Sequence, residues 1–190
     1  MATIYNTATT LDGFLATTDN SLEWLFEVPG ADEAESGIGD FLAGIGALAM
    51  GSTTYEWVVE HESLVEHPEH WTAWYADRPT WVFTHRDLPV VAGVDIRFTH
   101  NPVEAVHAEM VAAAHDKDIW LMGGGDLVGQ FADAGLLDRI TATVAPVTLG
   151  AGAPLLPREL HSDRLTLLSV EQRGQFAELT YAVGPPHPAT

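Results

Sequence analysis

The chain has 190 residues, of which 46% are hydrophobic, and this is enough for one domain with a sizeable core. Its formal net charge of −19, from 27 acidic against 8 basic residues, argues against nucleic acid and anionic membranes as partners. Cysteine is absent, which excludes disulfides, thiolate catalysis and cysteine-ligated zinc, and no apolar run is long enough to cross a membrane, so we expect a soluble, cytoplasmic protein.

The first half of the chain predicts strands that alternate with helices. Residues 3–9 are rich in β-formers, residues 11–16 turn and resume extended structure, and residues 17–30 are typical of a loop. The helical spacing of Ile38, Phe41 and Leu42 predicts a helix over residues 31–43. A short apolar run at 45–50 predicts a buried strand, and the polar turn 51–54 connects it to a helix at 55–60.

The second half continues this alternation and then changes its period. After an acidic loop that contains histidines we expect strands at 80–84 and 95–98, then a helix with Asn101 as N-cap and Pro102 in the first position, ending near His115. A strand at 119–122 and a helix to about Gly135 follow. The remaining expected elements are a strand at 138–147, a glycine-rich loop at 149–154, and a hairpin of strands at 165–171 and 175–183.

These elements predict an α/β fold in a single domain over residues 1–190, with a loose proline-rich tail at 184–190. Strand and helix alternation followed by a hairpin predicts a three-layer arrangement. In it, a mostly parallel central sheet carries helices on both faces and an antiparallel C-terminal hairpin at one edge.

One stretch, residues 119–131, suggests where a ligand binds. Its buried strand leads into three glycines, Gly123, Gly124 and Gly125, and an amphipathic helix then begins. Residues without a Cβ let a ligand approach the backbone, and the first amides of a helix lack intrahelical partners, so such a turn binds phosphate. The alternative is that the glycines only permit a tight turn and Asp126 only caps the helix.

Four segments, in order, resemble the dihydrofolate reductase fold, and specifically the reductase domain of the bifunctional deaminase-reductase of riboflavin biosynthesis and its stand-alone relatives. They are Thr10-Leu-Asp-Gly-Phe-Leu-Ala16 with Leu22-Glu-Trp-Leu25, Met50-Gly-Ser-Thr-Thr-Tyr-Glu56, Leu121-Met-Gly-Gly-Gly-Asp-Leu127 and Val144-Ala-Pro-Val-Thr-Leu-Gly-Ala-Gly-Ala-Pro-Leu155. The resemblance implies an NADPH-dependent reductase that transfers a hydride to a small heterocyclic substrate of pyrimidine or pterin type. It also implies a homodimer.

The resemblance assigns two sets of residues to the cofactor. The phosphates would contact the turn after the second strand and the glycine turn, at residues Gly51, Ser52, Thr53, Thr54, Gly123, Gly124, Gly125, Asp126 and Leu127. The adenosine 2′-phosphate would contact Thr84, His85 and Arg86, and the Arg86 guanidinium would donate two hydrogen bonds to it. Alternatively, Arg86 pairs with a surface acid. Family members often carry arginine where this chain has Ser52, so one charged contact is missing.

The substrate side, by the same resemblance, lies near the turn after the first strand. Asp12 would hydrogen-bond the substrate as the catalytic residue beside Gly13, and the alternative is a plain Asp-Gly turn. Trp24 and Tyr55 would offer flat walls, unless they pack in the core, and Pro146 and Leu149 would approach the nicotinamide from the other side. No spacing selects a catalytic acid among Asp32, Glu33, Glu35 and Asp40.

Three other interpretations of the sequence remain. One is a binding protein that keeps the dinucleotide or aromatic-ligand cleft without turnover, and another is a flavin-utilising variant of the same cleft. The third concerns residues 60–70, which place three histidines and four glutamates close together, as in a divalent-metal site or a solvated acidic loop. The spacing is not that of a zincin helix and Pro68 interrupts it, so we predict no metal.

Overall fold

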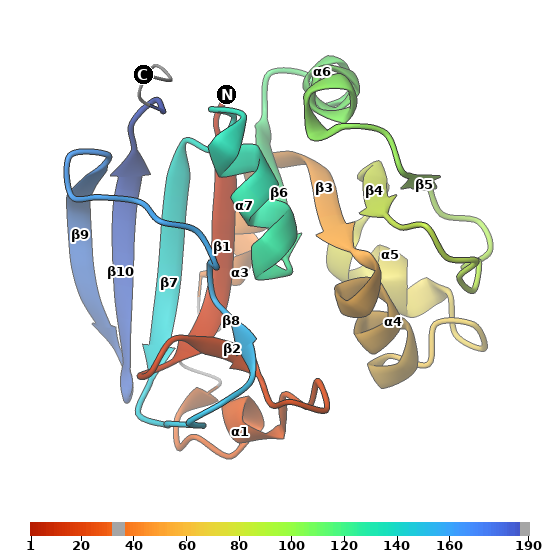
Figure 1. The fold of residues 1–190 in the computed structure, drawn as a ribbon. Helices are drawn as coiled ribbons and strands as arrows, with labels where there is room; N and C mark the ends of the chain where they lie inside the picture. The colour runs from red at the N-terminus through yellow and green to blue at the C-terminus, as the bar shows by residue number, and fades with distance from the viewer. Residues whose placement is uncertain (32–36, 187–190) are drawn as a thin grey trace.

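A sheet of eight strands runs through the part of the chain that the structure describes (Figure 1). The computed structural model describes residues 1–31 and 37–186. In spatial order the strands are β5 (Ile96–Thr99), β4 (Thr80–Phe83), β3 (Ile45–Gly51), β6 (Asp118–Gly123), β1 (Thr3–Thr10), β7 (Arg139–Ala145), β10 (Phe176–Val183) and β9 (Leu165–Arg173).

The pairing of these strands is parallel over most of the sheet. From β5 through β4, β3, β6 and β1 to β7 every neighbouring pair is parallel, whereas β7 with β10 and β10 with β9 are antiparallel. A separate two-stranded ribbon joins β2 (Phe14–Ala16) to β8 (Ala153–Pro154). The predicted fold class, a mostly parallel sheet with an antiparallel C-terminal hairpin, is confirmed.

Helices cover both faces of the sheet because successive side chains of each strand point to opposite faces. On β3, Ala49 belongs to the cluster packed under α6 and α7, and its neighbour Met50 to the cluster packed under α4 and α5. On β4, Trp81 and Val82 divide in the same way. The described helices are α1 (Glu23–Phe26), α3 (Ile38–Ala43), α4 (Ser52–His61), α5 (Glu69–Tyr75), α6 (Val103–Ala113) and α7 (Gly125–Asp133).

Several local predictions were wrong where tertiary packing overrides the local pattern. The predicted loop at 17–30 contains α1, whose Trp24 is buried, and the predicted loop before β4 contains α5, whose Trp71 is buried. Helix α4 starts three residues earlier than predicted, after Gly51. The N-cap of α6 is Pro102 and not Asn101, because Pro102 is still extended at ψ 146°.

Two predictions reach beyond the described residues. Of the helix predicted over residues 31–43, the structure describes α3 at its end, and Asp32, Glu33 and Glu35 lie outside the described residues. Of the tail at 184–190, residues 187–190 lie outside them as well. Within the described ranges, no helix combines the length and apolar character that crossing a membrane requires.

The order of the strands creates a point where the chain changes direction across the sheet. Strand β3 leads through α4 to β4 on one side, whereas its neighbour β6 leads through α7 to β7 beyond β1. The two helices lie on opposite faces and start at adjacent carboxyl ends of parallel strands (Figure 1). In open α/β sheets, ligands bind in the crevice at such a switch point.

The packing of α6 against β3 yields a stability prediction. A Cβ on Gly46 would lie 2.2 Å from the carbonyl oxygen of Ala114, so Gly46→Ala must displace backbone and should lower the free energy of unfolding by about 1–3 kcal/mol. At Gly39 in α3 a Cβ meets nothing within 4 Å, so Gly39→Ala is the matched control and should be neutral or slightly stabilising. Urea unfolding of both variants and the wild type measures this; equal midpoints for both variants would contradict the prediction.

Candidate functional site

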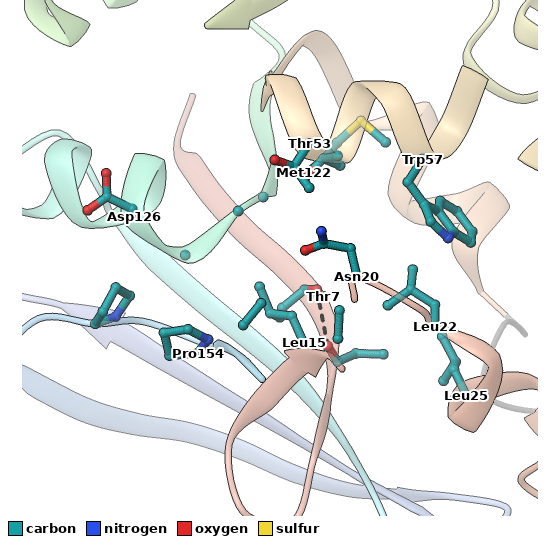
Figure 2. Close-up of a pocket in the computed structure, with 18 of the residues that line it drawn as sticks. Thr7, Leu15, Asn20, Leu22, Leu25, Thr53, Trp57, Met122, Asp126 and Pro154 are labelled. Carbon is teal, nitrogen blue, oxygen red and sulfur yellow. Dashed lines mark hydrogen bonds between the residues drawn. The ribbon is translucent and has the colours of Figure 1, made fainter. Parts of the chain in front are cut away.

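Two adjoining cavities open at the carboxyl ends of β3 and β6. The first, called here the apolar cavity, has a volume of about 360 Å³, and the second, called the polar cavity, about 500 Å³. Both are lined by Thr53, Thr54, Gly124 and Asp126, so the two cavities adjoin each other, and together they are called the cleft here. Figure 2 shows the apolar cavity, which α4, α7, β1, β2 and the segment around α1 enclose.

The glycine turn between β6 and α7 forms the boundary between the two cavities. The Gly123–Gly124 peptide bond is cis, and Gly124 is the N-cap of α7. A Cβ on Gly125 would lie 2.4 Å from the carbonyl oxygen of Pro154, so this glycine is required by packing against the loop after β7. A Cβ on Gly124 would meet nothing within 4 Å. The bare backbone of Gly124 therefore faces open space.

Two helices begin beside each other at this turn. Gly51 is the N-cap of α4, and a Cβ on it would lie 3.6 Å from the amide nitrogen of Gly124. Neither α4 nor α7 has a side-chain hydrogen bond at its N-cap. The first amides of both helices therefore point into the cleft with partial positive charge, an arrangement that binds anions.

The far end of the polar cavity contains Arg86. Its guanidinium donates hydrogen bonds to both carboxylate oxygens of Glu56, at 2.9 and 2.6 Å, and to the Ser52 hydroxyl at 2.8 Å. The Arg86 side chain is 53% exposed, and ion pairs at such exposure contribute about 0–1 kcal/mol. Arg86 thus pairs with an acid, as one sequence interpretation held, while lying beside the start of α4.

The structure brings the predicted cofactor residues together in this cleft. Each of the twelve lines one of the two cavities. The polar cavity is lined by Gly51, Ser52, Thr53, Thr54, Thr84, His85, Arg86, Gly124, Asp126 and Leu127, and the apolar cavity by Gly123 and Gly125.

The two aromatic residues predicted to contact substrate have different places. Trp24 lines the apolar cavity and is 6% exposed. Tyr55 is fully buried in the cluster under α4, where its hydroxyl donates to the carbonyl oxygen of Pro89 at 2.7 Å and burial raises its pKa to about 12. Tyr55 therefore packs in the core, which is the alternative that the sequence offered, and it lines neither cavity. Its role toward substrate stays a prediction.

The predicted catalytic residue, Asp12, lies outside the cavity walls. Its carboxylate accepts hydrogen bonds from the Thr10 hydroxyl at 2.6 Å and from the amides of Leu149 and Gly150, the latter at 2.7 Å. The Thr10 hydroxyl and then the Gly150 amide lower the Asp12 pKa. Asp12 thus ties the turn after β1 to the loop after β7, which is the Asp-Gly turn interpretation.

Three further residues predicted on the substrate side lie near the hydrogen bonds between Asp12 and the loop after β7. Gly13 has φ +82° and its carbonyl accepts from the Leu155 amide at 2.9 Å, Leu149 packs beside the cluster around Trp24, and Pro146 is exposed. None of the three lines either cavity in the described part of the chain. Their roles toward substrate stay predictions.

Sequence reasoning missed most of the apolar wall. The described lining residues that it did not predict for the site are Thr7, Ala8, Leu15, Ala16, Asn20, Leu22, Leu25, Trp57, Met122, Ala153, Pro154 and Pro157. One signal was available: Trp57 follows Thr53 by four residues, so helical periodicity places both on one face of α4. The residues around α1 line the cavity because the chain folds back over it after β2. No local sequence pattern predicts this fold-back.

The histidine-rich segment does not join the cleft. His67, Glu69 and His70 place potential ligand atoms within 4.8 Å of one another, but all three are exposed. His67 Nδ1 lies 3.2 Å from Glu69, and His70 Nδ1 donates to the carbonyl oxygen of Glu62 at 2.9 Å. These contacts are those of a solvated loop and the start of α5, and the alternative of a metal stays open.

Comparison with known proteins agrees with this geometry. The family model described as the RibD C-terminal domain matches residues 2–177. The uncharacterized protein YwjB of Bacillus subtilis (strain 168) is 30% identical over 179 residues, which are 94% of this chain and 96% of YwjB.

Two solved structures show the same fold. One is a diaminohydroxyphosphoribosylaminopyrimidine deaminase/5-amino-6-(5-phosphoribosylamino)uracil reductase from Thermotoga maritima, with a TM-score of 0.65 and 13% identity over 96% of this chain and 56% of that one. The other is a dihydrofolate reductase from Enterococcus faecalis complexed with NADP(H), with a TM-score of 0.58 and 16% identity over 96% of both chains. At these identities the likeness concerns the fold alone, and this chain spans little more than half of the bifunctional protein.

The bonds of Asp12 predict a pH-dependent contribution to stability. Because its folded-state pKa is lowered, Asp12 stabilises the fold above its unfolded pKa of about 3.9, and that stabilisation is lost as the pH falls through the folded value. Asp12→Ala should therefore lower the melting temperature at pH 7, and its difference from wild type should shrink toward pH 3. Thermal unfolding across this range tests the prediction, which a pH-independent difference would refute. Asp19→Ala is the comparison variant, because the side-chain hydrogen bond of this exposed carboxylate is a local one from the Thr17 hydroxyl and not one to the loop after β7.

Proposed function

We propose a function on the premise that the chain belongs to the RibD C-terminal domain family. Solved structures of this fold include reductases, and the chain resembles oxidoreductases at the level of its fold. The protein is an NADPH-dependent reductase that transfers a hydride to a small heterocyclic substrate. The substrate occupies the apolar cavity and the dinucleotide occupies the polar one.

The observation that carries this proposal is the pair of helix starts at Gly51 and Gly124. Two uncapped N-termini that lie side by side supply amides for a diphosphate, and the hydroxyls of Ser52, Thr53 and Thr54 add neutral donors. The open space at Gly124 allows close approach to its backbone. This donor set fits a dinucleotide, even though Ser52 lacks the charge that relatives often place there.

Because the two cavities adjoin each other, a cofactor in one and a substrate in the other would lie close together, which supports hydride transfer between them. A bound nicotinamide cofactor supplies the hydride, which adds to one atom of a C=N or C=O bond while a proton from water adds to the other. The chain's part is to hold both rings across the glycine turn. Asp126 is the only carboxylate on the described apolar wall, and it pairs with Arg158 at 3.0 Å, so we assign no protein acid to the step.

The second candidate function is ligand binding without turnover. The position of Asp12 favours it, because the predicted catalytic carboxylate is occupied by backbone amides and lies outside both cavities. Oxidation of NADPH with a reducible ring compound distinguishes the two functions, since a binding protein would bind NADPH and leave it reduced.

Two expectations from the sequence stay part of the proposal. A homodimer is one, and the outer strand β9 offers it exposed apolar side chains at Leu167, Leu168 and Val170. The other is a cytoplasmic location, where NADPH is available.

A valine at the boundary of the two cavities tests the phosphate site. Gly124 has φ −79°, which valine adopts readily, so Gly124→Val should fold while its side chain blocks the approach of a diphosphate. We expect NADPH affinity, measured by nicotinamide fluorescence or calorimetry, to fall at least tenfold, about 1.4 kcal/mol. Gly39→Val, at a position that is equally open but lines neither cavity, is the control. Unchanged affinity in a folded Gly124→Val protein would rule this site out.

Arg86 and Glu56 together predict the choice between NADPH and NADH. Because Glu56 competes for the guanidinium, a charged hydrogen bond from Arg86 to the 2′-phosphate contributes at most about 1.5–3 kcal/mol, and the preference for NADPH is at most about ten- to a hundredfold. Arg86→Ala should erase most of it while sparing NADH, whereas Glu56→Gln, which removes the competing carboxylate, should increase it. Titration of each variant with both cofactors measures the ratio. A ratio that neither variant changes would mean that the 2′-phosphate is not recognised by Arg86.

A further inference from the structure

We propose that the substrate is an uncharged, flat ring compound without a phosphate group, an inference that rests on the proposed reductase function. It concerns the apolar cavity alone. The chemistry of the cavity wall, the pairing of the cations around it and the shape of its aromatic side chains each support it.

The wall of the apolar cavity carries almost no charge. Its described residues include no lysine, arginine or histidine, and Asp126 is the only ionisable side chain among them. Asp126 lies at the end shared with the polar cavity and pairs with Arg158. Away from the helix starts at the end shared with the polar cavity, an anion in this cavity would lose its water without gaining a charged partner, a large cost. The net charge of −19 adds repulsion.

The arginines that border the cavity already have carboxylate partners. Arg158 pairs with Asp126 at 3.0 Å and with Asp133 at 2.8 Å. A smaller hollow of about 220 Å³ adjoins the apolar cavity and shares Thr7, Ala8 and Leu25 with it. Its arginine, Arg173, pairs with Glu171 and Glu178, at 3.3 and 3.0 Å. A substrate phosphate reaching into either place would have to compete with two carboxylates.

Aromatic side chains give the cavity flat walls. The Trp57 ring lies against the ring of His61, with centroids 4.4 Å apart and planes 15° from parallel. Phe26, from α1, stacks on the same His61 ring at 5.4 Å and so helps to hold the position of Trp57. Trp24 also lines the cavity and is buried. Rigid rings at these positions favour a planar molecule, and about 360 Å³ is within the range of small-ligand sites.

Neutral polar groups remain to orient such a ring. Asn20 has φ +65°, a conformation that asparagine tolerates, and its backbone N–H donates to the carbonyl oxygen of Thr17 at 3.0 Å, which leaves its side-chain amide for a ligand. Figure 2 shows the Asn20 side chain within the cavity, between Thr7 on β1 and Thr53 on α4. The Asn20 side-chain amide and the Thr53 hydroxyl can each donate to or accept from a heterocycle, and the Thr7 hydroxyl, which donates to the carbonyl oxygen of Ala8 at 3.2 Å, can accept from one. They do not neutralise a phosphate.

This assignment separates the chain from its solved neighbour in Thermotoga maritima, whose named substrate is a phosphoribosylamino uracil. The fold is shared, but the charge of the described cavity wall argues for a substrate that lacks the phosphate.

The test uses a matched pair of probes, 1,4-naphthoquinone and 1,4-naphthoquinone-2-sulfonate, which share a flat ring system and differ by one fixed negative charge. Binding to the full chain is followed by quenching of tryptophan fluorescence, because Trp24 and Trp57 line the cavity. Oxidation of NADPH in the presence of each probe is followed separately. We expect the neutral quinone to bind at least tenfold more tightly than the sulfonate.

The outcomes separate this inference from the proposed function. If NADPH binds and the sulfonate binds as tightly as the neutral quinone, or tighter, the inference is overturned and the proposed function stands. If NADPH does not bind, the proposed function fails whatever the quinones do. A preference for the neutral probe together with NADPH binding supports both.

A pair of charge variants gives a second, independent measurement. Leu22→Arg places a cation in the cavity wall, and it should reduce the discrimination against the sulfonate to less than threefold. Leu11→Arg adds the same charge at a residue that is 68% exposed and lines neither cavity, and its discrimination should match wild type. Equal behaviour of the two variants would mean that the quinones bind elsewhere, which also overturns the inference. Thermal unfolding verifies that both variants fold.

Discussion

The constraint on which the site depends most is the close approach of the backbones of Gly51 and Gly124, where the neighbouring strands β3 and β6 end. The strands are neighbours and parallel, so both of their helices must begin at the same edge, and the N-cap glycines Gly51 and Gly124 come together there. A side chain on Gly125 would collide with the loop after β7, so that loop fits against α7 only because the glycine is bare. The position of the cleft, its division into polar and apolar halves and its anion-binding character all follow from this contact.

The electrostatics of the molecule work at two scales. At long range the excess of acids repels any anion, but this field is screened over a Debye length of about 8 Å at physiological salt. At short range the amides at the two helix starts are fixed and need no reorganisation. The polar half of the cleft has these donors together with Arg86, whereas the described apolar half has no cation on its wall. The two halves therefore offer a ligand surroundings of opposite character.

The sequence predicted those features that depend on local pattern. Apolar runs located β3, β4 and β6, and the glycine run located the turn where the two cavities meet, because strand burial and missing side chains are visible in the residues themselves. It failed where distant packing decides. Nothing near Trp24 or Trp71 in the sequence indicates the core that makes α1 and α5 helical, and the burial of Tyr55 likewise depends on packing against distant residues such as Pro89. The bonds of Asp12 to the loop after β7 could not be predicted locally, because its amide partners are 137 and 138 residues away.

The pairing of Arg86 with Glu56 has a consequence for which anions the polar cavity admits. Because both carboxylate oxygens of Glu56 and the Ser52 hydroxyl already take three of the five N–H donors of the guanidinium, an incoming anion competes with an internal one for the rest of the interaction. A spherical monoanion such as chloride would offer one weak contact. A phosphate dianion would offer two oxygens in the same fork geometry. The internal carboxylate would therefore raise the affinity that an anion needs in order to bind at Arg86, and it would do so more for chloride than for phosphate.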